Sequence, residues 1–303
     1  MIFKSFVLCG LLTVLPVYAQ AAGASSNQEV VLTSEGGLEW DSNKKTLSAD
    51  TKALVVRGDT ALGADKIVAY YNDVNGKQDI FRVKAFGNVM ITTDKQVVYA
   101  DTATYEIADS LVILKGNPVK LIAGDEKMTA KVVELWQNKG IAIAKNNVVA
   151  QKNSRKLEAD TVRAYFAKNA KNATEIERFE AENNVVISTE REKVQGNTGT
   201  YWVQKETAML EGDVKISQGN NFIMGEVADI NMKTGVSRLQ TPSEKGKSKK
   251  QVHGVFTPDS AKRKQAQPEI EKPRKPEMLK EEKRDNGSER TEKLLSSSDE
   301  KGE

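Results

Sequence analysis

The sequence predicts an all-β protein made of many short strands at near-constant spacing. Three observations support this prediction: a long internal repeat, a recurring pair of turn-forming residues, and apolar residues that alternate with polar ones. Regularly spaced short strands with turn signals are typical of solenoids, barrels and jelly rolls, and not of α/β folds.

The internal repeat has a period of 96 residues. Residues 87–105 return in similar form as residues 183–201, so that Asn88 corresponds to Asn184 and Tyr105 corresponds to Tyr201. Such a period predicts that one structural unit is stacked more than once along the chain.

Shorter units within the repeat are marked by two anchors. The first is a pair of Gly, Asn or Asp residues, with successive separations of 29, 29, 30, 37 and 29 residues; the second is an Ala-Asp-like step, 13 residues later in five of six units. Because Gly, Asn and Asp tolerate the positive φ of tight turns, each first anchor is expected to open a strand. The first anchors are Gly58-Asp59, Gly87-Asn88, Gly116-Asn117, Asn146-Asn147, Asn183-Asn184 and Gly212-Asp213.

Two insertions interrupt this regularity. Residues 72–77 contain Asn75-Gly76, a strong hairpin signal, and residues 168–172 lie at the matching place in the next repeat. We interpret both as surface hairpins, with functional loops as the alternative.

Alternate residues after each anchor are apolar. Of the eighteen residues two, four and six positions after the second anchors, only Glu134 is polar, as in the series Ile67, Ala69, Tyr71 and the series Val132, Glu134, Trp136. After Gly116-Asn117, Pro118 shifts the apolar pair to Val119 and Leu121, which predicts a bulge or bend. One face of each strand is therefore apolar, and together these faces predict one long, narrow interior.

Both ends of the chain differ from this pattern. Lys4 and the apolar run that follows it, with small residues before the possible cleavage points after Ala19 and Ala21, predict a cleaved signal peptide over residues 1–21 and therefore export. Five of the seven prolines lie beyond Arg238, and residues 241–303 have mixed charge and few aromatic residues, which predicts a disordered tail. The folded domain is expected over residues 29–240.

Composition argues against several functions. The formal net charge is only +3 with both signs interspersed, which disfavours a nucleic-acid partner. The single histidine, His253, lies in the expected tail, and Cys9 in the expected signal peptide is the only cysteine, so we expect no catalysis, no metal and no cofactor. The recurring Asp residues, for example Asp65 and Asp160, are expected to shape turns and strand starts, with paired-carboxylate glycoside chemistry as the alternative.

With these features, the chain resembles the periplasmic lipopolysaccharide-transport LptA (OstA-like) family. The resemblance rests on the segment at residues 30–59, on the serial Gly-Asn-Val and Ala-Asp-x-x-x-x-Tyr units, and on the signal peptide. It covers about Glu29 to Arg238 and says nothing about the tail.

The resemblance implies a periplasmic protein with an incompletely closed, V-shaped β-jelly roll. An apolar groove in this fold would carry the lipid A acyl chains of lipopolysaccharide from the inner to the outer membrane. Such domains would stack end to end with one another and with inner-membrane-anchored LptC-like and outer-membrane LptD-like proteins. Exposed sheet ends suit this kind of docking.

The candidate lipid-binding residues come from two sources. The resemblance points to Val30 and Leu32 at the start of the first strand, and the alternation adds Ile67, Ala69, Tyr71, Val89, Ile91, Tyr105, Val162, Phe166, Val185, Ile187 and Tyr201. The alternative for each residue is ordinary core packing.

Two other function classes are open to a repeated β protein. A carbohydrate-binding or adhesin module would show an outward-facing aromatic or Asn/Thr ladder, whereas the recurring aromatic residues here are expected to face inward. A polysaccharide-cleaving β-helix enzyme would need a cluster of catalytic residues in one groove.

Overall fold

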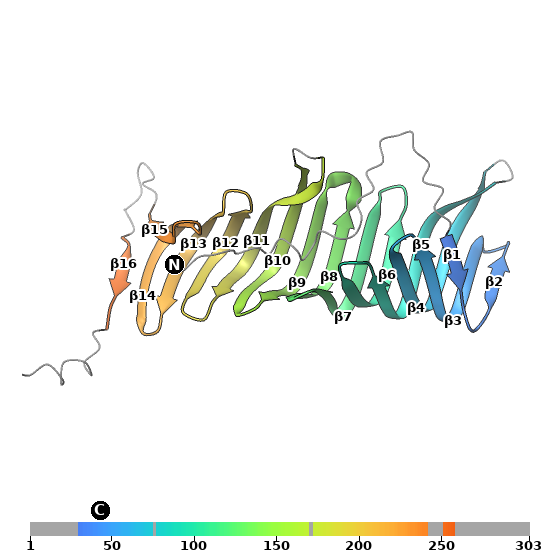
Figure 1. The fold of residues 1–303 in the computed structure, drawn as a ribbon, viewed down its shortest axis with the longest axis horizontal. Coiled ribbons are helices and arrows are strands. Elements are labelled where there is room, and N and C mark those ends of the chain that lie inside the picture. The colour runs from blue at the N-terminus through green and yellow to red at the C-terminus, as the bar shows by residue number, and fades with distance from the viewer. Residues whose placement is uncertain (1–29, 75–76, 170–171, 242–250, 258–303) are drawn as a thin grey trace, which may run out of the picture. The chain divides into compact units, whose positions relative to one another are not determined.

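The computed structural model describes residues 30–74, 77–169, 172–241 and 251–257. This part of the chain contains sixteen strands and one short 3-10 helix (Figure 1). The first eight strands are β1 (Val30–Thr33), β2 (Leu38–Asp41), β3 (Thr46–Arg57), β4 (Thr60–Val74), β5 (Lys77–Thr92), β6 (Val97–Glu106), β7 (Leu111–Ala123) and β8 (Glu126–Trp136). After the helix η1 (Gln137–Lys139) come β9 (Ile141–Lys152), β10 (Arg155–Lys168), β11 (Thr174–Ser188), β12 (Lys193–Trp202), β13 (Thr207–Gln218), β14 (Asn221–Asn231), β15 (Val236–Gln240) and β16 (His253–Val255).

All sixteen strands belong to one open antiparallel sheet. From β3 to β14 each strand pairs with the strand before it and the strand after it along the chain. At the first end β1 and β2 share the edge of β3, and at the other end β15 and β16 share the edge of β14. The expected all-β, unclosed architecture is confirmed.

The strands from β3 to β14 are longer than expected, because most first anchors lie inside strands. Gly87-Asn88 lies within β5 and Asn183-Asn184 within β11, where all four residues have positive φ. The prediction that these pairs form turns is correct for Gly58-Asp59, which joins β3 to β4, and wrong for the others. Positive φ inside a strand produces a β-bulge instead of a reversal.

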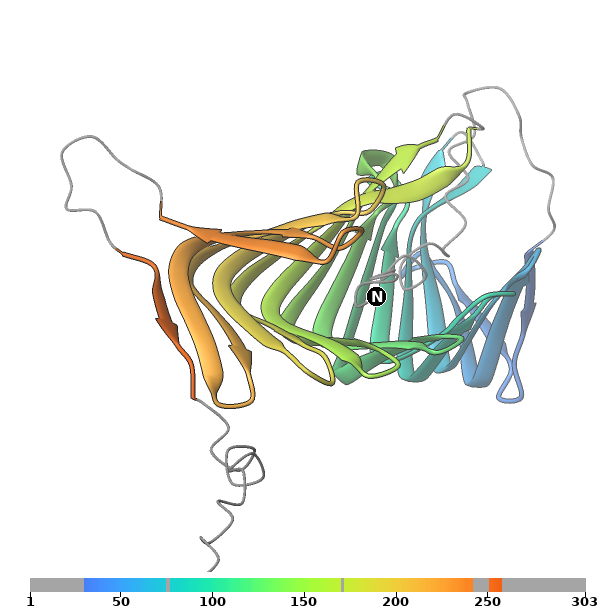
Figure 2. The same ribbon diagram turned by 60° about the vertical axis from the view of Figure 1, so that its left-hand side comes forward.

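These bulges follow one line across the sheet and bend every long strand. The pairing of β5 with β6 shifts between Phe86 and Val89, and the pairing of β11 with β12 shifts between Glu182 and Val185. Each bent strand therefore has two arms, which we call the first arm and the second arm (Figure 2). In β4 and β5, the first arm contains the β4 residues after Asp65 and the β5 residues before Gly87, and the second arm contains the remaining residues. Both arms continue across the neighbouring strands of the sheet.

Asn and Asp side chains support the bend in both repeats. The Asn88 amide donates to the Asp65 carboxylate over 2.9 Å, and the Asn184 amide donates to Asp160 over the same distance. In β6, the Asp101 carboxylate instead accepts from the backbone N–H of Asn117. Asp65, Asp101 and Asp160 thus have a local structural role at strand bulges, whereas Asp59 lies in the turn before β4.

The predicted bulge at Pro118 is confirmed. The pairing of β7 with β8 shifts between Lys115 and Val119, and the Asn117-Pro118 peptide bond is cis. Val119 and Leu121 are buried beyond this bulge, as the alternation predicted.

The apolar interior lies on one face of the bent sheet. In the part of β8 that follows Ala130, however, the buried residues are Val133 and Leu135, and the predicted inward series Val132, Glu134 and Trp136 is wrong. The predicted series is displaced by one residue because it is counted from the second anchor of the unit. This anchor, Ala130, is itself buried, whereas the anchors Asp65 and Asp101 of other units are exposed. Glu134 faces outward, where it accepts from Lys145 over 2.6 Å.

Several predictions lie outside the described residues, namely the signal peptide, the hairpin tip at Asn75-Gly76 and most of residues 241–303. Beyond residue 240 the structure describes β16, which pairs with the β14 segment Phe222–Met224. Within the described ranges, no helix has the length and apolar character needed to cross a membrane.

Candidate functional site

The interior of the bent sheet is lined by cross-strand rows of apolar side chains. We call three of them inner rows 1, 2 and 3, and each follows directly from the strand pairing. Inner row 1, in the first arm, is Ala49, Ile67, Ala85, Ala103, Leu114, Val133, Ala144, Val162, Ala181, Gly199, Leu210, Ala228 and Leu239. Inner row 2, in the same arm, is Trp40, Leu47, Ala69, Val83, Tyr105, Val112, Leu135, Ala142, Ala164, Phe179, Tyr201, Ala208 and Ile230.

Inner row 3 lines the second arm. It consists of Leu32, Val55, Leu62, Ile91, Val98, Leu121, Met128, Ala150, Leu157, Ile187, Val194, Ile216 and Ile223. None of the three rows contains a charged side chain, so an uninterrupted apolar lining runs through both repeats.

Inner row 1 is rich in small residues. Seven of the thirteen members of inner row 1 are Ala or Gly, including Ala85 and its counterpart Ala181 one repeat later. In the second repeat the side chains leave an apolar cavity of about 40 Å³, lined in part by Phe179, Ile187 and Tyr201.

The structure places twelve of the thirteen predicted lipid-binding residues in buried or half-buried positions. The buried ones are Ile67, Tyr71, Val89, Ile91, Val162 and Val185; the half-buried ones are Leu32, Ala69, Tyr105, Phe166, Ile187 and Tyr201. Val30, in the edge strand β1, is 57% exposed. Tyr71 is covered by Trp40, whose indole N–H donates to the Tyr71 hydroxyl over 2.7 Å.

Sequence reasoning missed the interior residues that precede each first anchor. Phe179 and Ala181 come before Asn183-Asn184, and Val83 and Ala85 come before Gly87-Asn88; all four lie in inner rows 1 and 2. Their period-two alternation is visible in the sequence, but a strand that starts at the anchor leaves these residues out.

The outer face of the first arm also carries aromatic residues. Of the recurring aromatics expected to face inward, Tyr105 and Tyr201 lie in inner row 2, whereas Trp136 lies on this outer face. Trp136 and Tyr165 lie on either side of Ile141 in one outer row, and Tyr70 and Trp202 belong to the same row. Lys139 lies 3.9 Å from the Trp136 ring centroid, and Arg178 lies 3.8 Å from that of Tyr165. Because the chain's own cations cover these ring faces, the row does not offer the free stacking platforms that a sugar would need.

Tyr165, Arg178 and Glu180 form a hydrogen-bonded cluster on this outer face. The Tyr165 hydroxyl and the Arg178 Nε–H each donate to the Glu180 carboxylate over 2.8 Å. Its hydrogen bond to Glu180, together with burial, raises the pKa of Tyr165. Although burial acts to raise the pKa of Glu180, the hydrogen bonds from Arg178 and Tyr165 outweigh it and lower that pKa. The cluster is a charge-assisted hydrogen-bond network of three surface side chains.

Both ends of the sheet expose apolar edge strands. At the first end Val30, Val31, Leu38 and Trp40 are 47–57% exposed. At the other end Val236 and Val255 are 56% and 46% exposed, and Phe256 is 71% exposed. Large apolar residues on unpaired edges mark docking surfaces.

The sequence matches the family model described as LptA/(LptD N-terminal domain) LPS transport protein twice, over residues 33–133 and 127–236. The chain belongs to this LPS transport protein family. The two matches meet at β8, so the LptA/LptD N-terminal unit occurs twice in tandem within one sheet. This duplication accounts for the period of 96 residues.

Comparison with solved structures finds LptH of Pseudomonas aeruginosa, described as the LptA-homologous periplasmic component of the lipopolysaccharide transport device. The match has 20% identity and a TM-score of 0.38, and it covers 44% of this chain and 95% of LptH. Comparison with curated protein sequences gives no match.

Proposed function

We propose that this member of the LptA/LptD N-terminal family binds lipopolysaccharide through its lipid A acyl chains. The protein would act in the periplasm as part of a bridge from the inner to the outer membrane, without catalysing a reaction. The observation that carries this proposal is the uninterrupted apolar lining of inner rows 1–3 through both repeats.

The lining suits a saturated acyl chain in chemistry and in shape. Each buried methylene contributes about 0.8 kcal/mol, so a chain of a dozen carbons gains on the order of 10 kcal/mol before ordering costs. Neighbouring sites must have similar affinity if a lipid is to move along them. Equivalent pairs such as Ile91 and Ile187, or Tyr105 and Tyr201, offer such sites one repeat apart.

The exposed edges suit partners of the same architecture. An edge strand of another such domain can pair with β1 and β2, or with β15 and β16, and thereby continue the apolar lining. We propose a further copy of this chain and LptC-like and LptD-like domains as these partners. Trp40 and Leu38, 56% and 55% exposed, extend inner rows 2 and 1 to the very edge of the sheet.

Site-specific photo-crosslinking in intact cells tests the cargo. A photoreactive residue at Ile91 should form a lipopolysaccharide adduct, because Ile91 lies in inner row 3 and is 8% exposed. The matched control is the adjacent Met90, 42% exposed on the opposite face, which should give no lipid adduct. Equal labelling at both positions, or an absence of adducts in folded, exported protein, would contradict the proposal.

Substitution supplies a second test. Ile91→Asp and Ile187→Asp should each block lipid occupancy while export continues. Circular dichroism of both variants separates loss of binding from loss of fold, since an unfolded variant would indicate that these residues serve as core.

A further inference from the structure

Glu126, at the start of β8, is a charged side chain inside the fold. It is 2% exposed, and no other charged residue of the described ranges is buried. Its Oε1 accepts a hydrogen bond from the Lys152 ammonium over 2.5 Å, whereas its Oε2 has no hydrogen-bond partner among the described residues. A buried carboxylate oxygen without a donor costs free energy. A ligand that brings a hydrogen-bond donor to Oε2 would therefore gain affinity.

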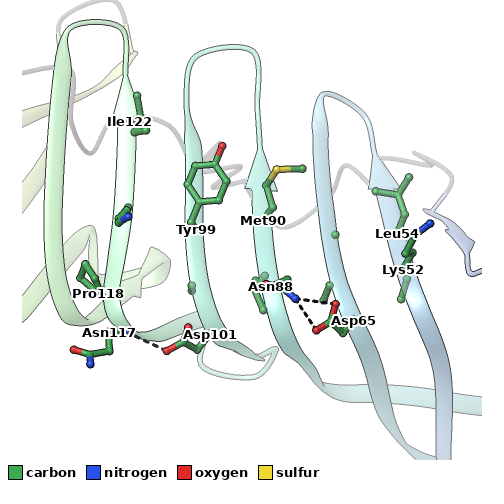
Figure 3. Close-up of a pocket in the computed structure, with 16 residues that line it drawn as sticks. Lys52, Leu54, Asp65, Asn88, Met90, Tyr99, Asp101, Asn117, Pro118 and Ile122 are labelled. Carbon is green, nitrogen blue, oxygen red and sulfur yellow. Dashed lines mark hydrogen bonds between the residues drawn. The ribbon is translucent and has the colours of Figure 1, made fainter.

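The row that contains Glu126 adjoins inner row 3. Glu126 lies two residues before Met128 of that row, on the same face of β8. The opposite, outer face carries Ile122, which lies beside Tyr99 and Met90 (Figure 3). The row of Glu126 runs along the end of the second arm, and we call it the second-arm border. Its members are Ala123, Glu126, Lys152 and Arg155.

The two borders of the apolar lining differ in polarity. Beyond inner row 2, at the end of the first arm, the buried side chains include Tyr71, Ile176 and Met232, which are 1–4% exposed. The second-arm border instead carries one carboxylate and two cationic groups. A molecule that fills the lining with its apolar part therefore finds charged groups beside it at the second arm.

The second repeat shows the same position with its donor in place. The hairpin of β13 and β14 corresponds to that of β7 and β8, and it pairs Gln218 with Asn221 where the first hairpin pairs Ala123 with Glu126. The Asn221 Oδ1 accepts a hydrogen bond from the Thr257 backbone N–H over 2.8 Å. At the end of the sheet the chain itself thus supplies a donor to this acceptor, whereas in the middle of the sheet Glu126 Oε2 receives none from the described residues.

We propose that Glu126 and Lys152 form a subsite for the head group of the bound lipid, in which Glu126 Oε2 accepts a hydrogen bond from a hydroxyl group of an acylated sugar. This inference rests on the proposed function, because the acyl chains would lie over Met128 and Ala150 of inner row 3 and extend from the border towards the bend. Lys152 and Arg155 place positive charge beside the sugar, which suits a head group that also carries anionic groups.

Two detergents with the same dodecyl chain test the subsite. Dodecyl maltoside has a sugar head group with many hydroxyl groups, and dodecylphosphocholine has no hydroxyl or N–H donor. In isothermal titration of the exported protein below the micelle concentration, Glu126→Leu combined with Lys152→Leu should weaken binding of dodecyl maltoside about tenfold, because the charge-assisted hydrogen bond is lost. The same double variant should bind dodecylphosphocholine as the wild type does.

The double variant is chosen so that the protein still folds. Replacing both partners of a buried ion pair by apolar side chains leaves no unpaired charge, so we expect a circular dichroism spectrum and a melting temperature like those of the wild type. The matched control is Asp125→Ala, which removes the adjacent, exposed carboxylate and should leave both affinities unchanged. Glu126→Gln retains an acceptor oxygen and should keep more affinity for dodecyl maltoside than the double variant.

Each other outcome overturns the subsite, and one of them also contradicts the proposed function. If the wild type and the double variant bind dodecyl maltoside equally, water satisfies Glu126 and the head group lies elsewhere. If the double variant loses affinity for both detergents alike, the ion pair only shapes the apolar lining. If the wild type binds neither detergent, the proposed binding of acyl chains fails, and the subsite fails with it.

Discussion

The two repeats share their interior and differ in their exterior. Inward positions one repeat apart hold similar side chains, as in Val89 and Val185 or Ile91 and Ile187. Some outward positions differ, since Gly63 corresponds to Glu158 and Tyr99 to Gln195, although Met90 and Val186 are both apolar. Because one sheet contains both copies, each repeat serves as a control for the other. The features common to both repeats define the fold and the lining.

The most severe test of the shared interior is a charge at its most buried positions. Val89→Asp and Val185→Asp should each cost about 4 kcal/mol of unfolding free energy, because both side chains are 1% exposed and neither variant would have a partner for the carboxylate. Thermal unfolding followed by circular dichroism measures the effect, with Val186→Asp on the outer face as a mild control. A variant that keeps part of its signal at the wild-type melting temperature would show that the repeats unfold independently.

A smaller effect should distinguish the two interiors where they differ. Phe179 is 4% exposed and has Val83 as its counterpart in the first repeat. Phe179→Ala should cost about 3 kcal/mol and Val83→Ala about 1 kcal/mol, because the ring leaves the larger cavity. Urea unfolding at constant m-value measures both. Equal losses would mean that the second repeat relaxes around the missing ring.

The bend should respond alike in both repeats. Asn88→Ala and Asn184→Ala should each cost about 1 kcal/mol, since both residues have positive φ and donate a hydrogen bond to an Asp carboxylate. Asn88→Gly and Asn184→Gly should be closer to wild type, because glycine adopts this conformation freely. The comparison uses chemical denaturation, and a Gly variant as unstable as the Ala variant would assign the stability to the hydrogen bond instead.

The smallest effect should be confined to the second repeat. Glu180 has Lys84 as its counterpart, so only the second repeat has a carboxylate whose pKa is lowered by hydrogen bonds from Arg178 and Tyr165. This contribution to stability is present above the ordinary Glu pKa and is lost as the pH falls through the lowered, folded-state value. Glu180→Gln should therefore flatten the acid limb of a plot of urea midpoint against pH. If the acid limb is unchanged in this variant, the loss of stability at low pH comes from other carboxylates.

The sequence was sufficient to predict the class of fold and much of the lining. Alternation after the anchors identified Val89, Ile91, Val185 and Ile187 as inward, and all four lie inside. The anchors were misjudged because Asn and Gly favour positive φ equally in a turn and in a bulge. Only the hydrogen bonding on both sides of Asn88 shows that β5 continues.

The cross-strand rows could not be predicted in the same way. Gly63 and Tyr99 are 36 positions apart in sequence, and they fall into one row only once the register of β4, β5 and β6 is known.

The order of the strands has a consequence for how the chain folds. Since each strand from β4 to β13 pairs only with its immediate neighbours in sequence, no pairing among these strands has to wait for a distant segment. Loop closure is short at every step, which favours rapid, sequential growth of the sheet. The first repeat contains all the partners of β3–β7. The first repeat can therefore assemble before the second repeat folds. Its last strand, β8, then presents the edge with which β9 pairs.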